Sequence, residues 1–162
     1  MPEILAFDQM FYKNFEPKMG NRFIMEIAGI ESYVVKTASR PTFTAEAVTL
    51  DHINISRKIK GKATWDDINI TLYDPIVPSG AQMVMDWVRT SHESITGRDG
   101  YAAFYKKDVN FFLLGPVGDK VEQWTLKGAF ITSANFGELD WSSNDPLSIE
   151  LTLAYDYAIL EY

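Results

Sequence analysis

A strict alternation of apolar and polar residues in two segments of this sequence constrains its fold most. In segment 67–73, Ile68, Ile70 and Leu72 stand between polar residues. In segment 147–157, the apolar positions are Leu147, Ile149, Leu151, Leu153, Tyr155 and Tyr157. Successive side chains of a strand point to opposite faces, so both segments are predicted to be antiparallel strands with one buried face. Further strands are predicted at 22–27, 33–36, 109–114, 121–126 and 129–133.

A single segment has the periodicity of a helix. Ser79 is a candidate N-cap, and Gln82 follows it at the spacing of a capping box. The apolar residues that then fall on one side are Met83, Val84, Trp87 and Val88. The pattern predicts one helix over residues 80–92, followed by a loop at 93–101.

Residues 37–62 form a long excursion with short β-like patches at 47–50 and 53–55. A basic cluster ends it, consisting of Arg57, Lys58, Lys60 and Lys62. An excursion of this length inside a compact domain is typical of an interaction loop, and a wide solvated hairpin is the alternative. Complementary charge fixes register in assemblies, so the basic cluster is predicted to pair with acidic patches on another copy of the chain.

Composition excludes several classes of function. The chain has 162 residues, about the length of one domain, and a formal net charge of −7 that opposes tight binding of nucleic acid. It has no cysteine, which excludes disulfides and thiolate metal sites. No apolar run approaches the ~20 residues of a membrane span, so no membrane anchor is expected.

The residue types that perform catalysis do not form known motifs in this sequence. His52 and His92 are the only histidines, they lie in different elements, and neither belongs to a metal-binding motif. Glu138 and Asp140 would face the same side if their segment is extended, but two carboxylates near a turn more often face solvent than form a glycosidase pair. We therefore expect no catalytic residue, no cofactor and no metal, and the chain is not expected to be an enzyme.

Two stretches carry a family resemblance when taken together. They are RKIKGKATWDDINITLYDP at 57–75 and GELDWSSNDPLSIELTLAYDY at 137–157, with NRFIMEI at 21–27 and VKTASRP at 35–41 in the corresponding order. This sequence resembles the tail tube protein family of contractile-tailed bacteriophages. The chain departs from that pattern in continuing past Tyr157 with AILEY.

The resemblance implies a mainly β fold, an antiparallel β-sandwich or barrel with one helix, in a single domain over residues 1–162. Six copies would close into a ring, and rings would stack into a hollow tube that conducts DNA into the host. Residues 1–19 would be an N-terminal arm, and residues 37–62 a long inter-subunit loop. The implied partners are further copies, the tail sheath protein, and baseplate and tube-terminating proteins. The protein would be made in the host cytoplasm and reside in the virion tail.

A conduit for DNA should present neutral or acidic groups to its lumen, because lysines there would hold the duplex by releasing its counterions. DNA would then pass without tight binding. The candidate lumen-lining residues lie on two predicted strands and are Asp67, Asn69, Thr71, Ser148, Glu150 and Thr152. Two alternative functions stay open: the inner tube of a contractile injection particle with protein cargo, and a carbohydrate-binding β-sandwich that uses some of the aromatic residues.

Overall fold

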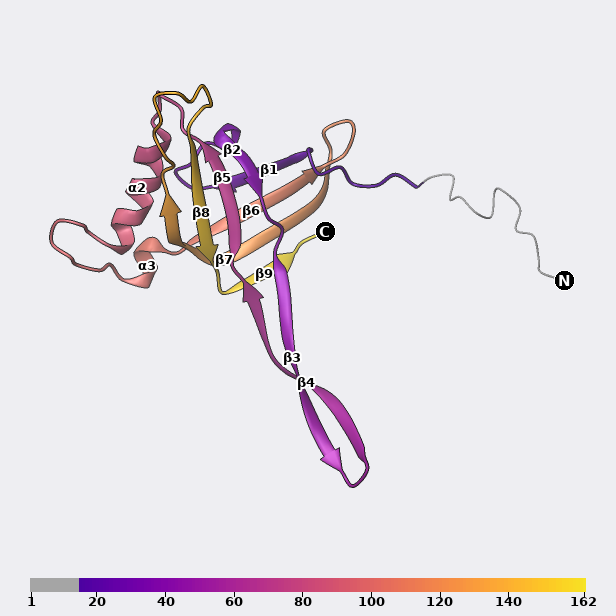
Figure 1. The fold of residues 1–162 in the computed structure, drawn as a ribbon. Coiled ribbons are helices and arrows are strands. Elements are labelled where there is room, and N and C mark those ends of the chain that lie inside the picture. The colour runs from indigo at the N-terminus through magenta and orange to yellow at the C-terminus, as the bar shows by residue number, and fades with distance from the viewer. Residues whose placement is uncertain (1–14) are drawn as a thin grey trace.

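The computed structural model describes residues 15–162 and consists mainly of antiparallel strands (Figure 1). The strands are β1 (Phe23–Ile27), β2 (Val35–Ala38), β3 (Thr42–His52), β4 (Ile55–Asp66), β5 (Ile68–Tyr73), β6 (Lys107–Leu114), β7 (Lys120–Asn135), β8 (Ser148–Ala154) and β9 (Tyr157–Leu160). The helical elements are a 3-10 turn η1 (Ser32–Val34), helix α2 (Gly80–Ser91) and the short helix α3 (Ala102–Tyr105). The predicted mainly β, antiparallel fold class is confirmed, and the short helix α3 is an addition to the one helix predicted. Residues 1–14 of the expected N-terminal arm lie outside the described residues.

The longest strand, β7, joins two parts of one sheet. Its first half pairs with β6 and β9, and β1 continues that part beyond β6. Its second half pairs with β8, and the sheet then continues through β5 to β2. The remaining strands, β3 and β4, pair with each other in a separate hairpin that projects from the body (Figure 1).

The core lies on the apolar side of the alternating strands. Ile70 on β5 is 1% exposed and stands opposite Leu151 on β8, and the flanking apolar residues of both strands are equally buried. Met25, Val109 and Leu126 close the core from the β1–β6–β7 part of the sheet. The predicted faces of β5 and β8 are thus confirmed.

Helix α2 covers part of this core. Val84 and Trp87 are buried there, with Met83 and Val88 packed beside them, as the helical spacing predicts. The predicted capping box is wrong, because Ser79 makes no side-chain cap bond and the carboxylate of Asp74 instead accepts the N–H of Ala81 at 3.2 Å. No helix within residues 15–162 is long and apolar enough to span a bilayer.

The C-terminal alternating segment forms two strands, β8 and β9, which follow each other along β7 with a kink between them. The alternation predicts an unbroken strand to Tyr157, but β8 ends at Ala154 and β9 begins at Tyr157, and both pair with β7 in the same direction. At the kink the carboxylate of Asp156 lies against Gly128, where a Cβ would be 2.3 Å from its Oδ2. Gly128 also has φ +68°, a conformation that glycine adopts without strain. Tyr157 is consequently exposed and lies outside the buried set.

The burial of Ile70 gives a direct test of the strand faces. Ile70→Asp places an unpaired charge in the core and is expected to prevent folding, because burying such a group costs several kcal/mol or more. Asn69→Asp adds the same charge at the adjacent exposed position and is expected to change stability by less than about 0.5 kcal/mol. Soluble yield and thermal unfolding followed by circular dichroism distinguish the two. A folded Ile70→Asp protein would mean that the faces are inverted.

Candidate functional site

The β3–β4 hairpin is exposed along almost its whole length. Every residue of β3 is exposed, and on β4 only Gly61 and Trp65 are partly covered. The segment predicted as a loop at 37–62 is therefore a regular hairpin over 42–66, while Thr37 and Ala38 belong to β2 in the main sheet. An exposed pair of long strands offers unpaired backbone groups to a partner.

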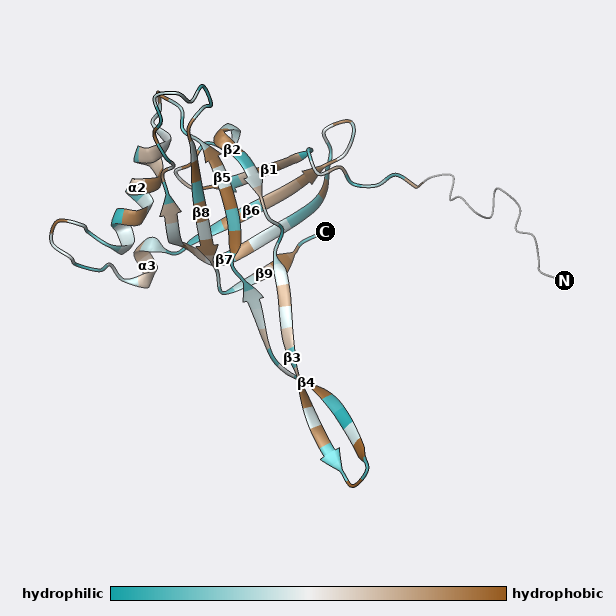
Figure 2. Ribbon diagram, viewed as in Figure 1, coloured by the Kyte–Doolittle hydropathy of each residue, from teal (hydrophilic) through white to brown (hydrophobic). Residues whose placement is uncertain are grey.

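The hairpin has two chemically different faces. Residues directly opposite each other in an antiparallel pair share a face. The pairs Val48–Ile59 and Leu50–Arg57 therefore put three apolar side chains and Arg57 on one side. The pairs Ala47–Lys60 and Thr49–Lys58 fall on the other side. Figure 2 shows this alternation as teal and brown bands along both strands. An exposed apolar face of this kind is typical of a surface that is buried in an assembly.

The four residues of the predicted basic cluster, Arg57, Lys58, Lys60 and Lys62, all lie exposed on β4. None of them forms an ion pair with another described residue. The Lys60 ammonium stands 5.1 Å from the centre of the Phe43 ring. Next to Lys60, the strand register shifts at Gly61, opposite Ala45–Ala47, where a Cβ on residue 61 would lie 3.0 Å from the carbonyl oxygen of Glu46. All four residues thus lie on one strand, with Arg57 on the opposite face of the hairpin from Lys58 and Lys60.

Aromatic residues fix the root of the hairpin to the body. Phe43 and Trp65 stand opposite each other, with ring centres 5.3 Å apart in an edge-to-face arrangement. Trp65 also lies 6.5 Å from Trp124 on β7 and 6.4 Å from Tyr155 beyond β8. Pairs of this geometry contribute about 0.5–1.5 kcal/mol beyond the area that they bury.

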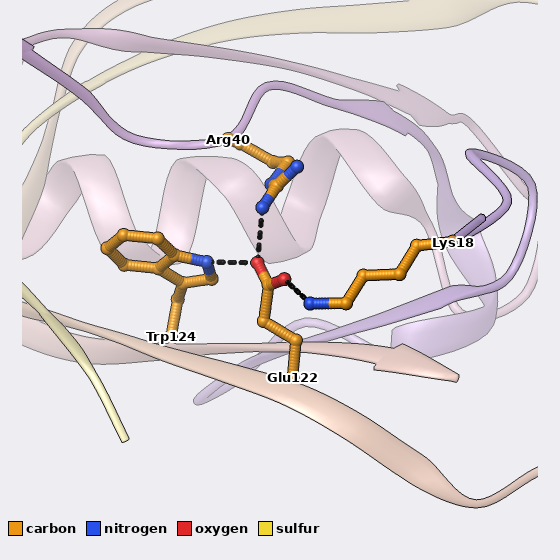
Figure 3. Close-up of polar contacts among 4 residues, drawn as sticks. All are labelled: Lys18, Arg40, Glu122 and Trp124. Carbon is orange, nitrogen blue, oxygen red and sulfur yellow. Dashed lines mark hydrogen bonds and ion pairs between the residues drawn. The ribbon is translucent and has the colours of Figure 1, made fainter. Parts of the chain in front are cut away.

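A buried carboxylate provides the second attachment (Figure 3). Glu122 on β7 is 3% exposed, and Arg40, between β2 and β3, donates a hydrogen bond of 2.5 Å to its Oε1. Lys18, ahead of β1, donates to Oε2, and the indole N–H of Trp124 donates to Oε1. Glu122 therefore ties the segment before β1 and the root of the hairpin to the same strand.

The environment of Glu122 favours its charged form. Burial alone would raise the pKa of this carboxyl, but the hydrogen bonds from Lys18, Trp124 and Arg40 outweigh that effect and lower the pKa below its ordinary value. A buried carboxylate with three donors is stable only while all of them stay in place. The arrangement makes Glu122 a structural anchor.

The predicted lumen-lining residues gather on one exposed face of the sheet. The pairs Asn69–Thr152 and Thr71–Glu150 stand directly opposite each other on β5 and β8, and Ser148 faces Tyr73. The Thr152 hydroxyl donates to the amide oxygen of Asn69 at 3.1 Å. Two residues of β7, Ser133 and Asn135, extend this polar face. Asp67 lies just before β5, at the junction with β4.

The residue types considered for catalysis do not converge. The Nδ1 atom of His92 lies 2.7 Å from a carboxylate oxygen of Asp99, whereas His52 ends β3 in the hairpin. Glu138 and Asp140 lie in an exposed loop, where Asp140 accepts hydrogen bonds from the backbone and side chain of Ser142 and its pKa is lowered by them. Within the described part of the chain, no group of three or more acidic or histidine side chains has the spacing of a metal site.

Glu122 was not among the residues predicted from the sequence. Alternation within segment 121–126 places Glu122 on the same face as Trp124 and Leu126, which is the apolar face. An acidic residue at such a position requires a cationic partner. Its place on the apolar face was therefore the feature of the sequence that could have identified Glu122 as a buried, paired carboxylate. Its partners are 104 and 82 residues away in sequence, so no local pattern identifies them.

Comparison with known proteins gives a consistent set of relatives. Residues 19–159 match the model of a family described as T4-like virus tail tube protein gp19. The tail tube protein gp19 of Enterobacteria phage T4 is 27% identical over 145 residues, which are 85% of this chain and 88% of that protein.

Two solved structures share the fold over nearly their whole length. A chain of the anti-feeding prophage cap, a tube terminating cap, matches with a TM-score of 0.76 and 19% identity, covering 97% of this chain and 99% of that one. The second structure is the sheath-tube complex of an extracellular contractile injection system, PVC, in its extended state. One of its chains matches with a TM-score of 0.72 and 21% identity, covering 98% of this chain and 99% of that one.

The role of Glu122 can be measured by a pH series on Glu122→Gln. At neutral pH the substitution removes the charge that Lys18 and Arg40 face, and we expect a loss of about 1–3 kcal/mol in the free energy of unfolding. The folded pKa is below the ordinary value of 4.5, so this contribution is present above about pH 4.5 and is lost as pH falls through the folded pKa. The stability gap to the wild type should therefore shrink below pH 4.5.

Urea unfolding at several pH values between neutrality and strong acid measures this gap. Glu26→Gln, at an exposed position on β1, is the matched control and should differ from the wild type by less than about 0.5 kcal/mol. A gap for Glu122→Gln that stays constant down to strong acid would contradict the assignment.

Proposed function

Since the chain belongs to the T4-like virus tail tube protein gp19 family, we propose that its copies close into hexameric rings that stack into a hollow tube, along whose lumen the phage genome passes. It is a structural tail tube protein of a contractile phage tail and a virion component, and the family is not enzymatic. The match favours this function over an injection particle with protein cargo and over a carbohydrate-binding module.

Two free edges of one sheet carry the proposal for ring closure. In the described chain, β2 pairs only with β5, and the second half of β7 pairs only with β8. These edges bound the β7–β8–β5–β2 part of the sheet on opposite sides. If β2 of one copy pairs with β7 of the next, each copy is rotated by the same amount, and the repeated contact closes into a ring. Such a ring leaves no exposed edge in this part of the sheet.

The polar face of β5 and β8 then lines the lumen. It bears amides and hydroxyls and the carboxylate of Glu150, with Lys36 at its rim on β2. A surface with so few cations releases few counterions from DNA and leaves the duplex hydrated and mobile. Helix α2 packs on the opposite, core side of the sheet, and so faces outward.

Several further proteins of the tail follow as partners. The outward side that carries α2 is the surface that we propose for the tail sheath protein. The two ends of the tube would contact baseplate and tube-terminating proteins, and DNA would pass the lumen without tight binding. Support for the sheath contact comes from the fold shared with a chain of a sheath-tube complex.

The inter-subunit role of the basic cluster predicts a loss of assembly in Arg57→Glu/Lys58→Glu. Both residues are exposed, so the subunit is expected to stay folded. Rings or tubes should be lost, because repulsion replaces attraction at a contact with a neighbour. Electron microscopy of the purified protein measures this. Arg89→Glu/Arg98→Glu makes the same change of charge at exposed positions on α2 and its following loop, and should assemble normally. Tubes of normal length from the first variant would remove the assigned role.

The lumen assignment predicts that lysines on the polar face will retain DNA. Tubes of Asn69→Lys/Thr152→Lys should bind short duplexes, with an affinity that falls by an order of magnitude or more between about 50 and 200 mM salt. Gln82→Lys/Ser94→Lys adds the same charge on the α2 side. Empty tubes of this variant, compared at equal length, should bind the duplexes less tightly. Equal binding by both variants would show that the polar face does not line the lumen.

A further inference from the structure

The loop over residues 136–147, here called the tip loop, lies at the opposite end of the molecule from the hairpin. It leads into β8 beside the Tyr73–Ser148 pair. The hairpin leads into β5 beside the Ile68–Leu153 pair, at the other end of the same two strands. Figure 1 shows the two features pointing in opposite directions from the body. A contact between the tip loop of one copy and the hairpin of another would therefore relate copies head to tail.

The tip loop presents large apolar side chains to solvent. Trp141 is fully exposed, and Leu139 is 86% exposed. The turn that carries Trp141 is built by hydrogen bonds to Asp140 Oδ1, which come from the backbone N–H and the hydroxyl of Ser142 at 3.0 and 2.9 Å. An exposed tryptophan on a hydrogen-bonded turn is the type of residue that anchors a protein interface.

The charges of the two ends are complementary. Acidic residues of the tip loop are Glu138, Asp140 and Asp145, and the loop contains no basic residue. None of the three pairs with a cation among residues 15–162. The hairpin combines the exposed apolar residues Ile53 and Ile55 at its tip with Arg57 and Lys58 directly behind them. The tip loop thus has an apolar centre beside acidic side chains alone. The hairpin tip has an apolar centre beside Arg57 and Lys58, and Asp51 is its acidic neighbour on β3.

We propose that the tip loop is the receptor for the hairpin tip of a copy in the adjacent ring, with Trp141 and Leu139 packing against Ile53 and Ile55 and the acidic side chains pairing with Arg57 and Lys58. This inference rests on the proposed stacking of rings and names the contact that produces it. A head-to-tail contact between opposite ends does not close on itself, so it propagates along the tube.

Cysteine cross-linking tests the contact in assembled tubes. The chain has no cysteine of its own, so Ile53→Cys/Trp141→Cys forms a disulfide only across the proposed contact. We expect oxidised tubes to give a denaturing-gel ladder that extends beyond six chains. The matched control Ile53→Cys/Ile95→Cys places the second thiol on another highly exposed loop residue and should give no ladder.

The possible outcomes separate the contact from the proposed function. Tubes without a ladder, or a ladder that ends at six chains because the contact is lateral, overturn the inference and leave the tube function intact. A wild-type chain that forms no tube even with baseplate nuclei contradicts the proposed function and this contact together.

Charge exchange gives a second test that does not alter Trp141. Arg57→Glu/Lys58→Glu reverses the charge of the hairpin, and Glu138→Lys/Asp145→Lys reverses the charge of the tip loop. Either change alone is expected to raise the critical concentration for tube formation about tenfold or more. Combining both reversals restores the net charge of −7 and should restore tubes. Combining the hairpin reversal with Glu26→Lys/Glu31→Lys restores the same net charge elsewhere and should not. Equal rescue by both combinations would overturn the contact.

Discussion

Backbone hydrogen bonding along β7 is the constraint on which the rest of the structure depends. This strand pairs with β6 and β9 over its first half and with β8 over its second, so both parts of the sheet take their position from it. The change of partner takes place near Gly128, whose positive φ and missing side chain allow Asp156 to approach. The apolar faces of the two parts consequently meet over one core, and the polar face of β5 and β8 is left outside.

Local patterns predict the elements that have one face on that core. β5, β8 and α2 each bury one side, and burial selects the apolar spacing from which they were predicted. The kink at Asp156 was not predictable, because alternation continues through it and its cause is the approach of Gly128 from β7. Glu122 was missed for a related reason, since its cations come from segments far away in sequence. In each case the determining contact is tertiary.

The hairpin illustrates how a subunit can be prepared for assembly. An isolated pair of strands is marginally stable in water, and most of this hairpin has no cover from its own body. Its root, by contrast, is held by Trp65 in the aromatic cluster and by the hydrogen bond from Arg40 to Glu122. A fixed root limits the directions that the hairpin explores, and so reduces the entropy lost when a neighbour binds it. The same carboxylate holds Lys18, which couples the segment before β1 to the hairpin.

The separation of charge along the molecule has a consequence for the polarity of an assembly. The protein is acidic overall, yet one strand of the hairpin carries four basic residues, and the loop at the opposite end carries only acidic ones. A copy added in the reverse orientation would bring hairpin to hairpin or loop to loop, and like charges across an interface cost several kcal/mol. Discrimination between orientations comes from this repulsion as well as from the attraction in the correct one. A chain with these two ends therefore favours stacking in which all copies point the same way. The proposed tube, whose two ends would bind different proteins, requires that polarity.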